Sequence, residues 1–162
     1  MQQLDRDERS ALMSATPEEV WAVVSDVTRA PDLSPEVSAC RWLDGATEPA
    51  VGVRFEATNT VNGRSWKNRP VITRVEPGHL LRFERTEPFA GTIAWQWTVT
   101  PADGGTHTTV AYEVTRPIRR IGWFVIERIY RAGNRRDELA SGMEQSLQRL
   151  AQLVSPNAQS GR

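Results

Sequence analysis

The residues best suited to chemistry are large aromatic and polar side chains on segments that alternate with a period of two. Trp95 and Trp97 share one side of such a segment, while Tyr112 and Asn59 take similar positions on two others. A phenol and an amide among large rings can orient a ligand carbonyl or hydroxyl, and small-molecule pockets are lined in this way. The alternative is that the rings fill a core, in which Asn59 and Tyr112 satisfy each other or the backbone.

A glycine inside a helical pattern supports the pocket. Gly142 costs about 1 kcal/mol relative to alanine in a helix, and it lies beside Met143 and one turn before Ser146. These side chains either leave space above the sheet or let the helix approach it closely. The predicted ligand-binding residues are Phe55, Asn59, Phe83, Trp95, Trp97, Tyr112, Gly142, Met143 and Ser146.

Other chemistry has less support in the sequence. Arg69 and Arg85 either approach the pocket rim, where they could meet an acidic ligand, or are solvated. His79 and His107 lie at separate turns without further ligands, so we expect no metal and no cofactor. No nucleophile elbow, phosphate-binding loop or dinucleotide glycine pattern occurs, and the catalytic residues remain unassigned. Cys40 is expected to be a small buried apolar residue.

The stretch Arg116–Arg136 is locally basic, with seven arginines against Glu127 and with interleaved apolar residues. Such a segment could lie on anionic lipid or on RNA. The alternative is a pocket lid or packing helix with solvated arginines. We expect 116–130 to border the mouth of the pocket, because its aromatic content suits contact with the domain.

Two short helices should precede most of the sheet. Thr16-Pro17-Glu18-Glu19 is a capping box with proline at the first helical position, and apolar residues continue to Val27. A second helical turn, about Ala30–Leu33, is limited by Pro31 and Pro35.

Strands and one long helix account for the rest of the chain. Asn62-Gly63 suits a tight hairpin, because both residues tolerate positive φ. The fold class is therefore α+β, with a curved antiparallel sheet of about seven strands around a long C-terminal helix. We expect one domain over residues 1–154 and a loose tail over 155–162. The helix carries an apolar stripe of Leu139, Met143, Leu147, Leu150 and Val154. The predicted strands are Leu4–Ser14, Val37–Leu43, Val53–Val61, Ser65–Glu76, Leu80–Glu87, Thr92–Thr100 and Thr106–Thr115.

Composition narrows the function classes. The chain has 162 residues, 39% of them hydrophobic and 25% charged, with a formal net charge of zero. We therefore expect no nucleic-acid partner. No run of about 18 apolar residues predicts a membrane span, and the first residues lack a signal-peptide core. With a single cysteine, these features favour the cytoplasm. The oligomeric state is left open.

Several local motifs, in order along the chain, carry a family resemblance. They are Ala15-Thr16-Pro17-Glu18-Glu19-Val20-Trp21, Asp26, Ser34-Pro35, Val51-Gly52-Val53-Arg54-Phe55, Glu76-Pro77-Gly78, Trp95-Gln96-Trp97, Gly104-Gly105-Thr106, Gly142-Met143 and Leu147-Gln148-Arg149-Leu150. In this order the chain resembles the helix-grip (SRPBCC) superfamily of START lipid-transfer domains, pollen-allergen-like proteins and polyketide cyclase/dehydrases.

The resemblance implies a cavity between the sheet and the terminal helix, holding a lipid, a polyketide-like molecule or a related metabolite. It carries no shared catalytic signature, so whether the chain is an enzyme stays open, with binding favoured. Catalysis would be cyclisation or dehydration by ligand folding and weak acid–base assistance, with Tyr112 the first candidate. The alternative is a non-enzymatic interaction protein, like the family's ribosome-associated toxin or quinone-binding branch.

Overall fold

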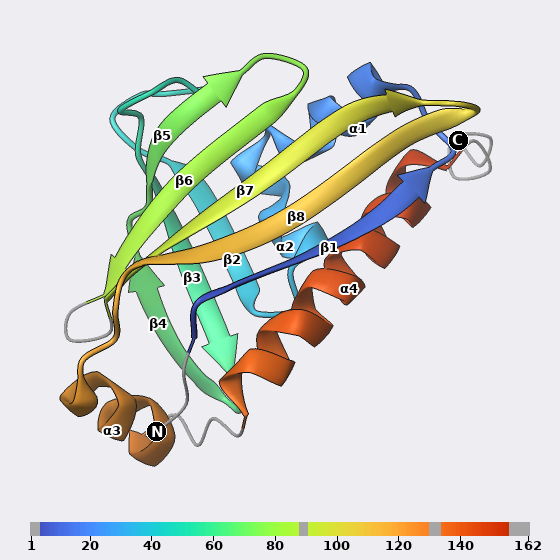
Figure 1. The fold of residues 1–162 in the computed structure, drawn as a ribbon. Coiled ribbons are helices and arrows are strands. Elements are labelled where there is room, and N and C mark those ends of the chain that lie inside the picture. The colour runs from blue at the N-terminus through green and yellow to red at the C-terminus, as the bar shows by residue number, and fades with distance from the viewer. Residues whose placement is uncertain (1–3, 88–90, 130–133, 156–162) are drawn as a thin grey trace.

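A computed structural model describes residues 4–87, 91–129 and 134–155 of the chain. In Figure 1 the long helix α4 lies across the concave side of a curved antiparallel sheet, with α1 and α2 beneath the same sheet and α3 at one end. The strands are β1 (Arg6–Met13), β2 (Val37–Trp42), β3 (Phe55–Val61), β4 (Arg64–Asn68), β5 (Val71–Glu76), β6 (Leu80–Glu87), β7 (Gly91–Ala102) and β8 (Gly105–Arg116). The helices are α1 (Pro17–Val24), the 3-10 turn η1 (Val27–Arg29), α2 (Ala30–Leu33), α3 (Arg120–Ile129) and α4 (Arg135–Val154).

The strands pair in the order β1-β8-β7-β6-β5, with β2-β3-β4 as a second group, and each pairing is antiparallel as expected. The predicted strand Ser65–Glu76 is divided, because Pro70 between β4 and β5 has no N–H to donate to a ladder. A bridge between Arg54 and Val71 joins the two groups at this break. The sheet thus remains curved and nearly continuous around α4.

Local signals in the sequence act as expected. The Thr16 hydroxyl accepts from the Glu19 N–H at 3.2 Å, and the Glu19 carboxylate accepts from the Thr16 N–H at 2.9 Å. This capping box satisfies two donors that the first turn of α1 would otherwise leave unpaired. At the β3–β4 hairpin, Asn62 and Gly63 both have positive φ, at 51° and 75°.

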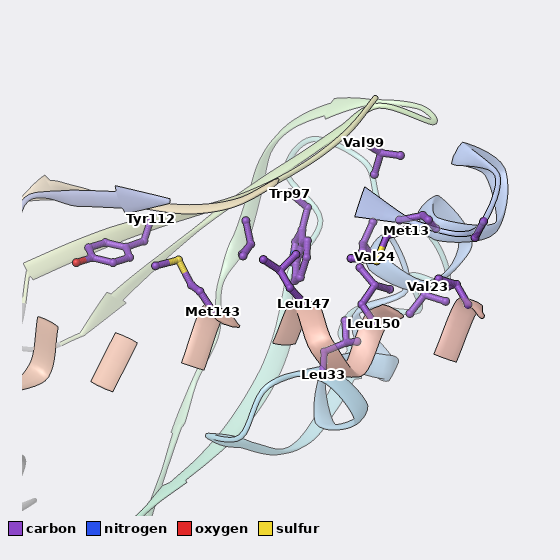
Figure 2. Close-up of a cluster of buried hydrophobic side chains, with 14 of the residues drawn as sticks. Met13, Val23, Val24, Leu33, Trp97, Val99, Tyr112, Met143, Leu147 and Leu150 are labelled. Carbon is purple, nitrogen blue, oxygen red and sulfur yellow. The ribbon is translucent and has the colours of Figure 1, made fainter. Parts of the chain in front are cut away.

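The apolar stripe of α4 packs on the sheet and on α1. Its five members, Leu139, Met143, Leu147, Leu150 and Val154, are all at most 4% exposed. Figure 2 shows Leu147 and Leu150 rising from α4 towards Trp97 on the sheet, with Val24 of α1 and Leu33 of α2 beside them. Burying each such side chain contributes roughly 1.5–3 kcal/mol, so this cluster fixes the helix against the sheet.

A second, smaller cluster consists of Val27, Phe55, Ile72 and Leu81, and Trp21 packs against both clusters. The two clusters divide the interior into a well-packed region under most of α4 and a region beneath β3, β5 and β6. Among the helices of the described residues, none is long and apolar enough to cross a membrane.

Candidate functional site

A cavity of about 140 Å³ lies between the sheet and α4, where side chains of both clusters meet. Because roughly 10–15 Å³ is enough for one water molecule, the cavity has room for a small organic group. Its wall is formed by Ala30, Leu33, Ser34, Pro35, Glu36, Val37, Cys40, Phe55, Ala57, Asn59, Asn68, Pro70, Phe83, Arg85, Trp95, Trp97, Val110, Glu138, Leu139, Gly142, Met143 and Ser146.

The register of the sheet brings the aromatic side chains together. Phe83 on β6 lies opposite Trp95 on β7, and Leu81 lies opposite Trp97. Directly opposed residues of antiparallel strands point to the same face, so these side chains share one face of the sheet, and Phe83, Trp95 and Trp97 lie on the cavity wall. Phe55 reaches the same wall from β3, and its ring meets that of Phe83 edge-on with centroids 5.1 Å apart. Strands far apart in sequence therefore build one apolar surface.

Asn59 supplies a polar group inside this apolar wall. The residue is 1% exposed, and no described residue offers a hydrogen-bond partner to its Nδ2. A buried amide N–H without a partner costs about 1–3 kcal/mol. Asn59 also lines the cavity, so this amide lies beside the space that a ligand would occupy.

A cation contributes to the same wall. The Arg85 guanidinium carbon lies 6.0 Å from the centre of the Trp95 ring, within the range of a cation–π contact. Arg69, the other arginine considered for the rim, lies elsewhere. Its Nε is 3.3 Å from Glu56 Oε2, and Glu56 points to the face of β3 opposite Phe55.

Tyr112 is the predicted residue that the structure does not place on the cavity wall. It is opposite Trp95 in the register of β7 and β8, and the two ring centroids are 5.5 Å apart. Because β8 is one strand farther from β3 than β7 is, the ring of Tyr112 lies behind Trp95. Figure 2 shows it above Met143 with its hydroxyl turned away from Trp97. Burial and, to a lesser degree, the nearby Asp7 carboxylate raise the pKa of its hydroxyl.

The helix side of the cavity is made of small and flexible residues. Gly142, Met143 and Ser146 line it, all from one face of α4. A Cβ added at Gly142 would have Pro35 Cγ as its nearest neighbour, at 3.8 Å, which is an ordinary contact. A side chain at position 142 would therefore not prevent α4 from packing against the sheet. Of the two explanations for Gly142, this leaves the one in which the missing side chain keeps space open in the cavity.

An ion cluster that was not predicted from the sequence lies at the edge of the cavity. Arg135, in the first turn of α4, donates to both oxygens of Glu36, with Nη2–Oε2 at 2.9 Å, and its Nη1 lies 3.3 Å from Glu138 Oε2. Burial tends to raise the pKa of Glu36, but the hydrogen bonds and charge of Arg135 outweigh this and lower it. The sequence did contain one indication of this ion pair. A positive charge in the first turn of a helix is unfavourable with the helix dipole, so Arg135 needs an acidic partner there.

Two other expectations concern Cys40 and the basic segment. Cys40 lies on the cavity wall, and burial raises the pKa of its thiol to about 12, so it is a neutral side chain at physiological pH. For the basic segment, no described residue of 116–130 lines the cavity wall, and its place at the cavity mouth stays a prediction. Tyr130 lies outside the described residues.

This arrangement can enclose an apolar ring system and orient it by an oxygen atom. The titratable groups on the wall are Glu36, Cys40, Arg85 and Glu138, and both carboxylates are engaged with Arg135. Among the described residues, no group of histidine, cysteine and carboxylate side chains could hold a metal ion. An apolar wall with a few polar groups is the usual lining of a small-molecule pocket.

Known proteins with similar sequences and structures agree with this architecture. A bifunctional cyclase/dehydratase of the granaticin polyketide synthase from Streptomyces violaceoruber is 32% identical over 115 residues, which are 68% of this chain and 34% of that protein. The chain thus spans about a third of the length of this relative.

Solved structures show the same fold at lower identity. The di-domain aromatase/cyclase StfQ of the steffimycin biosynthetic pathway matches with a TM-score of 0.74 at 13% identity, over 95% of this chain and 51% of that one. A START superfamily protein from Mycobacterium smegmatis matches with a TM-score of 0.69 at 14% identity, over 93% and 97% of the two chains. The model of the family described as "Polyketide cyclase / dehydrase and lipid transport" matches residues 8–155. Because the match covers nearly the whole chain, the chain belongs to this polyketide cyclase/dehydrase and lipid transport family.

Proposed function

We propose that the protein binds a hydrophobic or aromatic small molecule, of polyketide or lipid type, that carries at least one oxygen acceptor. The observation that supports this most directly is the Asn59 amide, which is buried on an apolar cavity wall without a protein partner for its Nδ2 among the described residues. A donor in that position is destabilising in the empty protein and favourable once a ligand oxygen accepts from it.

The rest of the wall is consistent with such a ligand. Phe55, Phe83, Trp95 and Trp97 offer flat apolar surface to a ring or chain, and a buried ring gains roughly 25 cal/mol per Å² of apolar area removed from water. Arg85 adds a positive charge on the same wall, which favours a ligand with an electron-rich oxygen.

The test uses native mass spectrometry for a co-purified ligand, and titration with an apolar fluorescent probe. Ser146→Leu places a larger side chain in the cavity, so we expect it to abolish probe uptake while the melting temperature stays level or rises. Ser141→Leu is the matched control, since Ser141 is exposed on the same helix. An empty protein that takes up no probe would refute the proposal, as would equal losses in the two variants.

A second candidate function is cyclisation and dehydration of a polyketide-like substrate. The specific support is the 32% identity to a bifunctional cyclase/dehydratase, and a cavity that holds a flexible chain folded would bring its reacting carbons together. Incubation with a linear poly-ketone, followed by mass spectrometry, should then show a product lighter by one water. Unchanged substrate in the presence of demonstrated binding would leave the protein as a carrier.

A further inference from the structure

Helix α3 exposes two large apolar side chains that no packing in the described part of the fold covers. Ile121 is 58% exposed and Phe124 is 63% exposed. The other side of the helix is covered, because Trp123 is 6% exposed and Gly122 is buried. At 100° per residue, Phe124 and Ile121 lie about 60° apart on one face, with Arg128 between them and Arg120 beside Phe124.

The charge around this face is strongly positive. Residues 116–129 include Arg116, Arg119, Arg120 and Arg128, all exposed, against the single acid Glu127, which gives +3 on a chain whose net charge is zero. A local concentration of arginine beside exposed apolar side chains differs from an ordinary solvated surface, where apolar residues are scattered singly.

We propose that α3 is a docking helix for an anionic lipid surface, with Phe124 and Ile121 inserted among the lipids and the arginines paired with headgroup phosphates. Lipid fits both halves of the surface, since phosphates neutralise the arginines and the acyl boundary covers the apolar side chains. RNA phosphates would leave Ile121 in water. Figure 1 shows α3 at the end of the molecule where α4 begins, and Glu138 of the cavity wall lies in the first turn of α4.

The experiment is sedimentation of the full chain with phosphatidylcholine vesicles, with and without phosphatidylserine. We expect binding to the anionic vesicles that weakens as salt is raised. Arg120→Gln with Arg128→Gln should reduce the affinity about thirty-fold, at about five-fold per arginine near an anionic surface. Ile121→Ser with Phe124→Ser should reduce it at least about ten-fold.

The matched control variants replace arginines and apolar side chains that lie outside α3. Arg29→Gln with Arg74→Gln removes two exposed arginines, and Leu12→Ser with Val51→Ser removes two exposed apolar side chains. Both controls should bind anionic vesicles like the wild type. Hydrogen–deuterium exchange over 116–129 should slow on anionic vesicles, which reports docking without any substitution. Absence of vesicle binding, equal binding to neutral vesicles, or an unchanged exchange rate in this segment would overturn the proposal.

Discussion

Asn59 holds a buried amide donor beside the cavity and has no partner for its Nδ2 among the described residues. Asn59→Leu keeps the volume and removes a buried donor that lacks a partner, so we expect unfolding free energy to rise by about 1–2 kcal/mol. Affinity for a ligand with a carbonyl should fall about five-fold, by the ~1 kcal/mol of one hydrogen bond. Urea denaturation and ligand titration measure the two effects.

Thr108 offers the control for this variant. Its hydroxyl is also buried without a partner among the described residues, yet it lies off the cavity wall. Thr108→Val should therefore raise stability by about 1 kcal/mol and leave affinity unchanged. If Asn59→Leu behaved in the same way, Asn59 would have no role in ligand binding.

Tyr112 was predicted from the sequence to bind the ligand, but it does not lie on the cavity wall. Because Trp95 separates it from the cavity, Tyr112→Phe should leave ligand affinity within about two-fold of the wild type. If Tyr112→Phe lost as much affinity as Asn59→Leu in the same titration, Tyr112 would take part in ligand binding.

At the scale of elements, α4 contains a glycine that the fold does not require for contact. Gly142→Ala should raise the unfolding free energy by about 1 kcal/mol, since alanine is the better helix former and its Cβ meets only ordinary contacts. Gly105→Ala is the contrasting variant, because its Cβ would collide with the carbonyl oxygen of Met13 on β1. Thermal denaturation should show the first protein stabilised and the second destabilised.

The Glu36–Arg135 pair ties the start of α4 to the segment between α2 and β2. The pKa of Glu36 is lowered in the fold, so its contribution is complete above its unfolded value near 4.5 and is lost as pH falls through the folded value. Glu36→Gln should cost roughly 3 kcal/mol at neutral pH, because Arg135 stays buried with a weaker partner.

Urea denaturation at several pH values should show this difference shrinking in acid. Asp32→Asn, which breaks an exposed pair with Arg29, should change stability by less than about 1 kcal/mol. A Glu36→Gln difference that stayed constant down to acidic pH would mean that the pair does not stabilise the fold through the charge of Glu36.

At the scale of the whole molecule, the cavity lies where two core clusters meet, so a ligand there contacts both. Binding should raise the unfolding free energy by about 2.7 kcal/mol at a hundred-fold excess of ligand over its Kd. Tryptophan fluorescence and circular dichroism should follow one transition with and without ligand, as expected for one domain. Separate transitions for the two signals would indicate that the clusters unfold independently.

Sequence patterns that span only a few residues determined the positions of many helices, strands and turns in this protein. The stripe from Leu139 to Val154 specified the long helix and its buried face, and Asn62-Gly63 specified a hairpin. Alternation placed Trp95 and Trp97 on one side of their strand, and the structure has both on the cavity wall. These features follow from helix and strand periods and from turn chemistry, all of which a sequence displays directly.

The tertiary structure decided which of those side chains meet. Tyr112 shares the face of Trp95 and yet misses the cavity, because strand order and sheet curvature set the distance to the wall. The Glu36–Arg135 pair joins residues 99 positions apart, which no local pattern encodes. The sequence likewise did not determine which face of α3 points to solvent. An amphipathic helix can turn its arginines and exposed rings towards a cavity or away from it. The periodicity of a helix or strand determines which of its side chains share a face. Packing against the rest of the chain determines what that face contacts.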